Sequence, residues 1–227
     1  MTSPLLFQPL TLRGLTVRNR AWLPPMCQYA VDSHDGIPGT WHLIHYGSFA
    51  AGGFGLIVAE ATAVSPEGRI SPADTGLWND DQVAAWRTVT DAVHELGGKI
   101  AVQLGHAGRK ASTEKWWPGF HGSVVPPEQG GWIPVGPTTA PADGKQYVGL
   151  PVNALDENGI EKVVDHFRAA AARAVDAGFD AVELHSAHGY LLHQFYSPLS
   201  NTRTDGWGGD FDGRVRLPLE VAKAVRG

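Results

Sequence analysis

The sequence is poor in cysteine, because its 227 residues include only one, Cys27. A single cysteine excludes an internal disulfide and is typical of a reducing compartment. No apolar run reaches the ~20 residues that a helix needs to span a bilayer. The N-terminus lacks a basic segment followed by an apolar core, so no signal peptide is recognised. We therefore expect a cytoplasmic protein with no membrane partner.

Charged residues make up only 18% of the chain, against 43% hydrophobic residues, a balance that is typical of an ordinary globular protein. The 18 basic and 23 acidic residues leave a formal net charge of −5, which argues against nucleic acid as a partner. The length allows one large domain or two small ones. Because no linker is evident, we expect a single domain over residues 1–227.

Several nucleotide and hydrolase motifs are missing. No Gly-x-Gly-x-x-Gly follows the first predicted strand, and the glycines at 52–55 come before a strand instead, so a Rossmann site is unsupported. The chain also has no Walker phosphate loop, no Gly-x-Ser-x-Gly nucleophile elbow and no His-Glu-x-x-His zinc motif. These absences exclude the commonest dinucleotide, triphosphate and zinc sites.

Strand and helix patterns alternate four times after a predicted hairpin at residues 5–20. Such alternation predicts a parallel sheet with right-handed crossovers, either doubly wound or a (β/α)8 barrel. The strands are expected at 21–26, 56–63, 99–105 and from 181, and the helices at 40–51, 80–96, 157–177 and 214–225. Asn79 and Asp156 are the expected N-caps of the second and third helices. Pro218 is awkward in the last helix unless it lies in the first turn or kinks the helix. One side of the first helix carries Leu43, Ile44, Gly47 and Ala50.

A long irregular excursion separates the third strand from the third helix, over residues 107–153. It is rich in glycine and proline and carries Trp116, Trp117 and Trp132. A loop of this length in a compact domain is usually a functional lid or a small cap. The alternative is an insertion that is packed by its own aromatic side chains.

The fourth strand leads into the most polar cluster of the sequence. Val182 and Leu184 alternate with Glu183 and His185, so in a barrel the first pair would face the helices and the second pair the interior. His188 can join His185 only if the chain turns between them, which Gly189 and small neighbours allow. Such polar clusters at the C-terminal ends of strands are typical of catalytic sites in barrels.

This cluster suits proton donation to a small molecule. An imidazole can donate a hydrogen bond to an oxygen that gains charge. Tyr190, whose unperturbed pKa is about 10, stays protonated at neutral pH and can act as a general acid. The alternative is a structural histidine pair beside a tyrosine with a buried hydroxyl group.

Four segments together resemble the old yellow enzyme family, in its bacterial, thermophilic-like branch of NADPH dehydrogenases and xenobiotic reductases. They are Pro-Met-Cys-Gln-Tyr at 25–29, Gln-Leu-Gly-His-Ala-Gly-Arg-Lys at 103–110, His-Ser-Ala-His-Gly-Tyr at 185–190 and Ser-Pro-Leu-Ser-Asn at 197–201. The resemblance implies a (β/α)8 TIM barrel with FMN at its C-terminal mouth. It also implies an NAD(P)H-dependent ene-reductase, an oxidoreductase that reduces C=C bonds of α,β-unsaturated carbonyl or nitro compounds.

The resemblance also assigns roles to residues. His185 and His188 would bind the carbonyl or nitro oxygen of the substrate, Tyr190 would protonate its α-carbon, and Tyr29 would line the substrate pocket. The partners implied are a small activated alkene and further copies of the chain in a homo-oligomer. The residues implied to contact FMN are Pro24, Pro25, Met26, Cys27, Ala61 and Gln103.

The chain departs from the family by ending after four β/α units. The strand with a flavin-contacting arginine and the later loops that bind the FMN phosphate are missing. We expect either a fragment of a longer protein or a half completed by a second chain. A smaller departure is Phe-Asp-Gly-Arg at 211–214, where relatives carry Glu-Asn-Arg.

Two other functions stay open. One is a non-catalytic half-barrel that serves as an assembly module and needs a second chain to bind FMN. The other is a different barrel enzyme, such as a metal-assisted lyase or hydrolase, which is disfavoured because no acidic metal cluster is evident.

Overall fold

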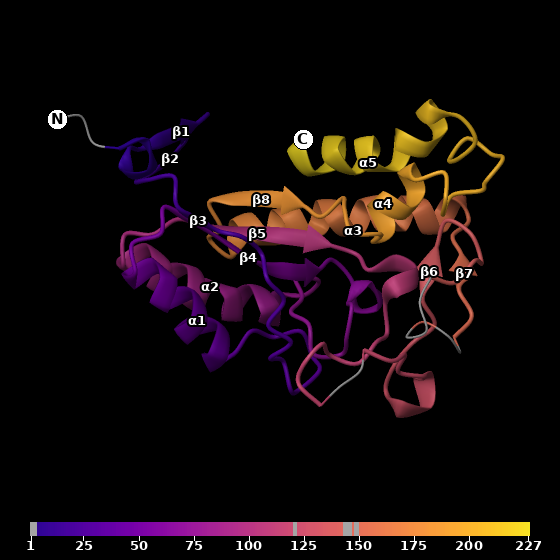
Figure 1. Cartoon of the computed structure of the whole chain (residues 1–227), viewed down its shortest axis with the longest axis horizontal. Helices are drawn as coiled ribbons and strands as arrows, with labels where there is room; N and C mark the ends of the chain where they lie inside the picture. The colour runs from indigo at the N-terminus through magenta and orange to yellow at the C-terminus, as the bar shows by residue number, and fades with distance from the viewer. Residues whose placement is uncertain (1–3, 120–121, 143–146, 148–149) are drawn as a thin grey trace.

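The computed structural model describes residues 4–119, 122–142, 147 and 150–227. Within these residues, four strands form one parallel sheet in the order in which they occur in the chain (Figure 1). The strands are β3 (Trp22–Leu23), β4 (Leu56–Ala63), β5 (Ile100–Gly105) and β8 (Ala181–Leu184). This arrangement confirms the parallel sheet that the alternating pattern predicts.

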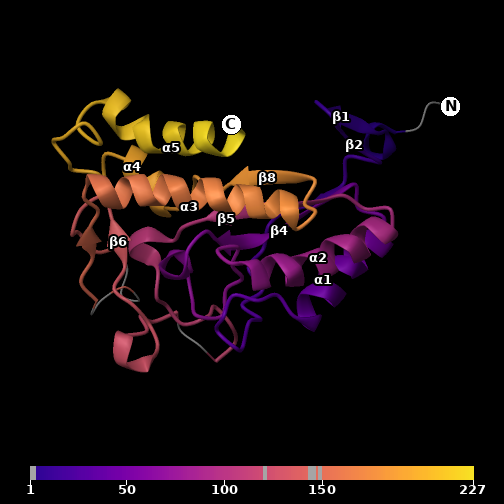
Figure 2. The same cartoon turned by 180° about the vertical axis from the view of Figure 1, so that it is seen from behind.

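Four helices form a continuous layer on one face of this sheet. They are α1 (Thr40–Ala51), α2 (Asp80–Glu95), α3 (Glu157–Asp176) and α5 (Phe211–Arg226), and each packs against the next (Figures 1 and 2). The main hydrophobic core lies between this layer and the sheet, and buries Ile57, Val102 and Leu104 with Trp86 and Phe167 of the helices. None of the helices in the described residues is long and apolar enough to cross a membrane.

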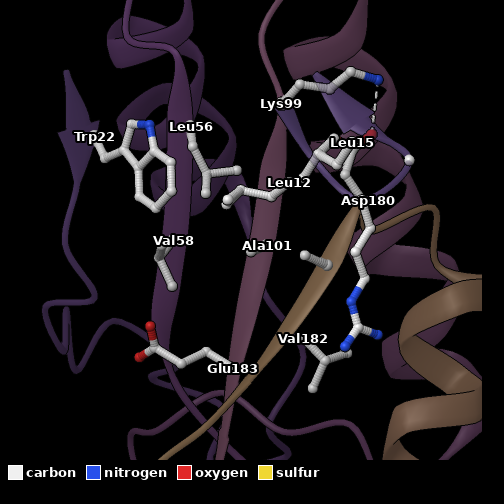
Figure 3. A pocket seen from close by; sticks show the side chains of 13 residues that line it. Leu12, Leu15, Trp22, Leu56, Val58, Lys99, Ala101, Asp180, Val182 and Glu183 are labelled. Carbon is white, nitrogen blue, oxygen red and sulfur yellow. Dashed lines mark hydrogen bonds and ion pairs between the residues drawn. The ribbon is translucent and has the colours of Figure 1, made fainter. Parts of the chain in front are cut away.

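The other face of the sheet is only partly covered. A hairpin of β1 (Leu10–Leu12) and β2 (Leu15–Val17) packs on its N-terminal end, against Leu56, Val58 and Ala101. The hairpin and the same face of the sheet together line a hollow of about 690 Å³, which Glu183 also borders (Figure 3). This face is the interior surface of the predicted barrel.

Local signals set the helix starts as predicted. Asn79 accepts a hydrogen bond from the Gln82 backbone N–H at 3.0 Å, and Gln82 Oε1 accepts from the Asn79 N–H at 3.2 Å, which closes a capping box at α2. Asp156 caps α3 by accepting from the Gly159 N–H at 2.7 Å. Helices α2 and α3 therefore begin at side chains that satisfy free N–H groups of their first turns.

Three details of the prediction are wrong. β3 is confined to Trp22–Leu23 instead of residues 21–26, because the prolines that follow have no N–H to donate to a ladder. The last helix begins at Phe211, capped by Asp210, and holds Pro218 in its interior. Helix α1 buries His42, Tyr46 and Ala50, whereas Ile44 is 62% exposed.

The described part of the 107–153 excursion is folded over the C-terminal end of the sheet. It contains single 3-10 turns at Gly108–Lys110 and Pro127–Gln129 and a short parallel pair, β6 (Val135–Gly136) with β7 (Asn153–Ala154). Trp132 attaches it to the rest of the molecule, since its indole Nε1 donates to the Glu67 carbonyl at 2.9 Å. Residues 120–121, 143–146 and 148–149 lie outside the described residues.

Candidate functional site

A sharp turn after β8 brings two imidazoles and a phenol together. His185 continues the ladder, because its N–H donates to the Leu104 carbonyl at 2.9 Å. The backbone then adopts positive φ at His188 (56°) and Gly189 (75°). The ring centroid of His185 lies 5.1 Å from that of His188 and 4.8 Å from that of Tyr190. The predicted convergence of these three residues is confirmed.

The strand geometry also agrees with the prediction. Val182 and Leu184 pack against the helix-side core, while Glu183 lies on the interior face, where its Oε1 accepts from Gln103 Nε2 at 2.6 Å. His185 follows in the same alternation at the carboxyl end of the strand. The cluster therefore lies at the C-terminal mouth of the sheet, where barrel enzymes hold their reacting groups.

The hydrogen bonds of His185 fix its protonation. Its Nδ1 accepts the backbone N–H of Ala187 at 3.3 Å, so the proton of the neutral ring is on Nε2. Burial, with a smaller contribution from the neighbouring His188, lowers the pKa of His185 to about 4. At neutral pH this side chain is therefore an uncharged donor through Nε2–H.

Tyr190 is held as a neutral phenol. Burial, followed by the influence of Cys27 and Asp74, raises the pKa of Tyr190 above its ordinary value. The Lys110 ammonium lies 5.9 Å from the centre of the Tyr190 ring and donates to the His188 carbonyl at 2.7 Å. The phenol thus keeps its proton over the physiological pH range, beside a turn that Lys110 holds in place.

Cys27 and Tyr29 reach this cluster from the segment that follows β3. With Ala61 and Tyr190, they pack against a small apolar core of Ile70, Ala107 and Ala111. Burial, then the nearby carboxylates of Asp74 and Glu60, raise the pKa of Cys27, so it is a neutral thiol. Tyr29 adopts a left-handed backbone with φ of 51°, a conformation that is uncommon for non-glycine residues.

The remaining predicted cofactor contacts lie on β4 and β5 and in the segment that follows β3, and we refer to them together as the apolar shelf. Ala61 of β4 and Gln103 of β5 are paired in register on the interior face, and Gln103 is in turn paired with Glu183. Met26 is 45% exposed, with Pro24 beside it on the surface and Pro25 and Cys27 half-buried. This combination of exposed apolar atoms and one amide fits the face and edge of a planar heterocycle.

Sequence reasoning missed Glu60, although it is the one charged residue in an otherwise apolar strand. A register shift between Ala59 and Ala61 leaves Glu60 unpaired and 1% exposed. Its carboxylate accepts from the Gln28 N–H at 2.8 Å and from the Tyr46 hydroxyl at 3.1 Å, and His42 Nε2 lies 3.3 Å away. Such bulges commonly occur beside active sites. Glu60 fixes the segment that carries Cys27 and Tyr29.

Asp74 is a second buried carboxylate that the sequence did not reveal. It accepts from the Ile70 N–H at 2.7 Å and from the Ser71 hydroxyl at 2.7 Å. Burial raises the pKa of Asp74 to about 7, against the opposing effect of these donors. The carboxyl group therefore fixes the turn that places Ile70 under Tyr190.

Gln194 joins the loops on either side of the cluster. It lies on the short helix α4 (Leu191–Tyr196) and is 1% exposed. Its Nε2 donates to the Gly189 carbonyl at 2.7 Å and the Ala107 carbonyl at 3.1 Å, while its Oε1 accepts from the Arg109 N–H at 3.2 Å. A side chain at Gly108 would place its Cβ 2.4 Å from Gln194, which explains a glycine there.

A family model described as "NADH:flavin oxidoreductase / NADH oxidase family" matches residues 5–227. The chain belongs to this family. Among its relatives, the NADH:flavin oxidoreductase FG08077 of Gibberella zeae is 46% identical over 227 residues, which are 99% of this chain and 54% of that protein. The NADPH dehydrogenase of Listeria innocua is 45% identical over 221 residues, which are 97% of this chain and 60% of that protein.

Solved structures of the family agree with the fold. Morphinone reductase superimposes with a TM-score of 0.83 at 38% identity, covering 99% of this chain and 59% of that one. An old yellow enzyme from Pichia sp. gives a TM-score of 0.86 at 30% identity, covering 98% of this chain and 56% of that one. The structure is therefore part of an old yellow enzyme barrel, not a doubly wound sheet, and it spans a little over half the length of these relatives.

Proposed function

We propose that this chain supplies the substrate-facing half of an FMN-dependent NAD(P)H oxidoreductase that reduces activated C=C bonds. The observation that carries the proposal is the convergence of His185, His188 and Tyr190 at the mouth of the sheet. The ring centroid of His185 lies 5.1 Å from that of His188 and 4.8 Å from that of Tyr190. The substrates are α,β-unsaturated carbonyl or nitro compounds, whose oxygen needs a donor and whose α-carbon needs a proton. A homo-oligomeric state and a cytoplasmic location stay predictions.

The apolar shelf is the part of the chain that would hold the flavin ring. The two-electron chemistry of the site, in which hydride is taken from NAD(P)H and given to the β-carbon, is what FMN supplies when bound. The residues proposed to contact it are Pro24, Pro25, Met26, Cys27, Ala61 and Gln103. The exposed Met26 and the in-register pair of Ala61 and Gln103 support this assignment.

His185 and His188 bind the substrate oxygen in this proposal. The Ala187 N–H fixes the His185 ring so that Nε2–H is directed away from its own backbone. The donor is neutral and preorganised, so it stabilises charge that develops on the oxygen without first losing a proton. Loss of one such donor typically raises the barrier by roughly 2.7–4 kcal/mol.

Tyr190 provides the proton. Its O–H bond breaks as a C–H bond forms at the α-carbon, and solvent returns a proton to the phenolate. Its raised pKa ensures that the proton is present at every physiological pH. A positioned general acid contributes about 10²–10⁴-fold to the rate of the step it serves.

The test is a chimera in which this chain is continued by the C-terminal part of the Listeria innocua NADPH dehydrogenase. We expect the purified chimera to be yellow and to oxidise NADPH under nitrogen only when cyclohexenone is added. A folded, flavin-loaded chimera that leaves cyclohexenone unreduced would contradict the proposal. A folded chimera without flavin would favour the non-catalytic assembly module instead.

A further inference from the structure

A small cavity at the mouth of the sheet is shared by a carboxyl group and two of the reacting groups. Asp74, His185 and Tyr190 all line this cavity, which we refer to as the inner cavity. Its volume is about 10 Å³, which is room for about one water molecule. The lining also includes the small or apolar residues Ala61, Ile70 and Ala107.

The two oxygens of Asp74, which is 2% exposed, accept different numbers of hydrogen bonds. Oδ1 accepts from the N–H and from the hydroxyl group of Ser71, at 3.2 and 2.7 Å. Within the described residues, Oδ2 accepts one hydrogen bond, from the Ile70 N–H at 2.7 Å. Because a carboxylate oxygen has two acceptor sites, Oδ2 is the atom with room for a proton.

The acidities of Asp74 and Tyr190 favour proton transfer from the first to the second. Burial, against the opposing effect of the donors, raises the pKa of Asp74 to about 7. Burial also raises the pKa of Tyr190 above its ordinary value, so its phenolate is a far stronger base than the Asp74 carboxylate. A group whose pKa lies near the working pH can both give and regain a proton.

Asp74 is the group beside the inner cavity whose protonation changes near neutral pH. Its charged neighbours in the described residues are Glu60 of β4 and Arg69 of the same loop, whose opposite charges act on it in opposite directions. Four other neighbours are uncharged at neutral pH because burial shifts their pKa values: His106, His185, Cys27 and Tyr29.

Ser71 connects Asp74 to the surface on the other side. Its hydroxyl group donates to Asp74 Oδ1, and the same residue borders a pocket of about 170 Å³. The exposed residues His34 and Gln129 also line that pocket. Asp74 is therefore one side chain away from a pocket that solvent reaches, while its other side borders the inner cavity.

We propose that Asp74 returns the proton to Tyr190 after each transfer to the substrate, across the inner cavity that both side chains line. The proposal rests on the function proposed above and names the group through which solvent restores the general acid. The O–H bond of the Asp74 carboxylic acid breaks, and one water molecule passes a proton to the Tyr190 phenolate, which becomes a phenol. The Asp74 carboxylate then takes up a proton from solvent. Asp74 thus acts on Tyr190 rather than on the substrate.

The first measurement needs no flavin. Aspartate carboxyl carbons of the chain are labelled with ¹³C, and NMR follows their pH titration, with the Asp74 signal assigned through Asp74→Asn. We expect a midpoint near 7. Tyr190→Phe should raise this midpoint by about half a pH unit or more, because the ionised carboxylate loses a hydroxyl donor across the cavity. A midpoint near the ordinary value of about 3.9, or one that Tyr190→Phe leaves unmoved, would overturn the proposal.

The second measurement compares two successive reoxidations of the flavin-loaded chimera. Stopped-flow absorbance follows reoxidation by cyclohexenone, reduction again by NADPH, and a second reoxidation after a variable delay. In Asp74→Asn, we expect the second reoxidation after a short delay to be about tenfold or more slower than the first, because Tyr190 has not regained its proton. The second rate should recover as the delay lengthens.

Asp180→Asn is the matched control. Asp180 is also largely buried and accepts a backbone N–H, from Ile100 at 2.9 Å, but it lies at the opposite end of the strands. Its two reoxidations should have equal rates. Equal slowing of both reoxidations in Asp74→Asn would mean that the carboxyl group only holds its turn, and unaltered rates would mean that the proton returns by another route. Either result overturns the proposal.

The pH dependence gives a third readout. In the unmodified chimera, the second reoxidation should slow as the pH rises above about 7, because ionised Asp74 has no proton to return. Ser71→Ala keeps the carboxyl group and removes a donor to its ionised form, so it should raise both this pH and the NMR midpoint. This variant decides the question if Asp74→Asn does not fold, and an unmoved pH would contradict the proposal. If the chimera does not reduce cyclohexenone, the proposed function fails, and the NMR titration still tests the link between Asp74 and Tyr190.

Discussion

At the scale of single residues, burial rather than residue type sets the chemistry of the site. His185 is a neutral donor because a backbone N–H occupies its Nδ1 and the ring is removed from water. Cys27 is a thiol rather than a reactive thiolate, because burial and the carboxylates of Asp74 and Glu60 disfavour its charged form. Both groups therefore keep their protons at neutral pH, and His185 can donate a hydrogen bond through Nε2–H.

The protonation of His185 can be followed by NMR. Since its folded-state pKa of about 4 lies below the unfolded value of about 6.5, the stability that neutral His185 contributes is present above pH 6.5 and is lost as the pH falls through 4. We expect long-range ¹H–¹⁵N spectra to show the Nε2–H tautomer and no protonation down to about pH 5. A titration midpoint near 6.5 would show that the ring is solvated and only loosely held.

Cys27 gives a second prediction at this scale. If its thiol contacts the flavin edge, Cys27→Ala should shift the flavin midpoint potential of the assembled protein by about 30 mV or more, which is about 1.4 kcal/mol for two electrons. The fold should be unchanged, since the side chain is small and only half-buried. A redox titration with unaltered potential would return Cys27 to the role of an inert thiol.

At the scale of elements, the turn after β8 depends on α4. The side-chain amide of Gln194 donates to the carbonyls of Gly189 and Ala107. Asn201 Nδ2 donates to the carbonyls of Phe195 and Trp207 at 2.6 and 2.7 Å. These two amides connect α4 to the strand ends before it and to the loop after it. The positive φ of His188 is maintained by this surrounding network.

Gln194→Glu tests this connection with a substitution of equal size. The new carboxylate cannot donate, so two buried carbonyls lose their partner, and we expect the free energy of unfolding to fall by roughly 2–4 kcal/mol. Urea denaturation measures the change. The exposed Gln129 provides a control, because Gln129→Glu should alter the free energy of unfolding by less than about 0.5 kcal/mol. Equal effects at the two positions would contradict the role of Gln194.

The helix starts could be predicted from the sequence because their capping partners lie close by in the chain. Asn79 and Asp156 were recognisable as N-caps because their partners lie three residues away. On α1, Ala50 and Leu43 of the predicted side pack on the core, but Tyr46 is buried there too and its hydroxyl group donates to Glu60, a polar residue that hydrophobic periodicity does not count. Ile44 is left exposed as a result.

Distance along the sequence also decided which residues of the site could be predicted. His185, His188 and Tyr190 lie within six residues of one another, so a turn was enough to predict their convergence. Glu60 and Gln194 were missed because their partners are distant in sequence: Gln28 lies 32 residues from Glu60, and Ala107 lies 87 residues from Gln194. Only the folded sheet brings those pairs together.

At the scale of the whole molecule, the described residues form one side of a barrel. The interior face of the sheet borders a hollow of about 690 Å³, where Leu56, Val58 and Ala101 face the hairpin and open space (Figure 3). The relatives that the chain matches extend well beyond it, since the chain spans 54–60% of their length. The hairpin buries these three side chains, which are 3–7% exposed, while the rest of the interior face borders the hollow.

Cofactor capture follows from this geometry. If the apolar shelf contacts only one side of the flavin, as proposed above, the 227-residue chain alone should retain little FMN after desalting. The chimera with the C-terminal part of the Listeria innocua relative should retain one FMN per chain, measured by flavin absorbance. Stoichiometric flavin on the chain alone would mean that the described residues form a complete site.

The FMN contacts and the cluster of His185, His188 and Tyr190 are proposed to serve different half-reactions. The most direct test is Tyr190→Phe in the flavin-loaded chimera. Stopped-flow absorbance separates flavin reduction by NADPH from reoxidation by cyclohexenone. The account predicts that flavin reduction stays within about threefold of the unmodified protein, while reoxidation slows by about 10²–10⁴-fold because the α-carbon lacks its proton donor. Reoxidation of Tyr190→Phe at the unmodified rate would show that Tyr190 is not the acid and would contradict the account.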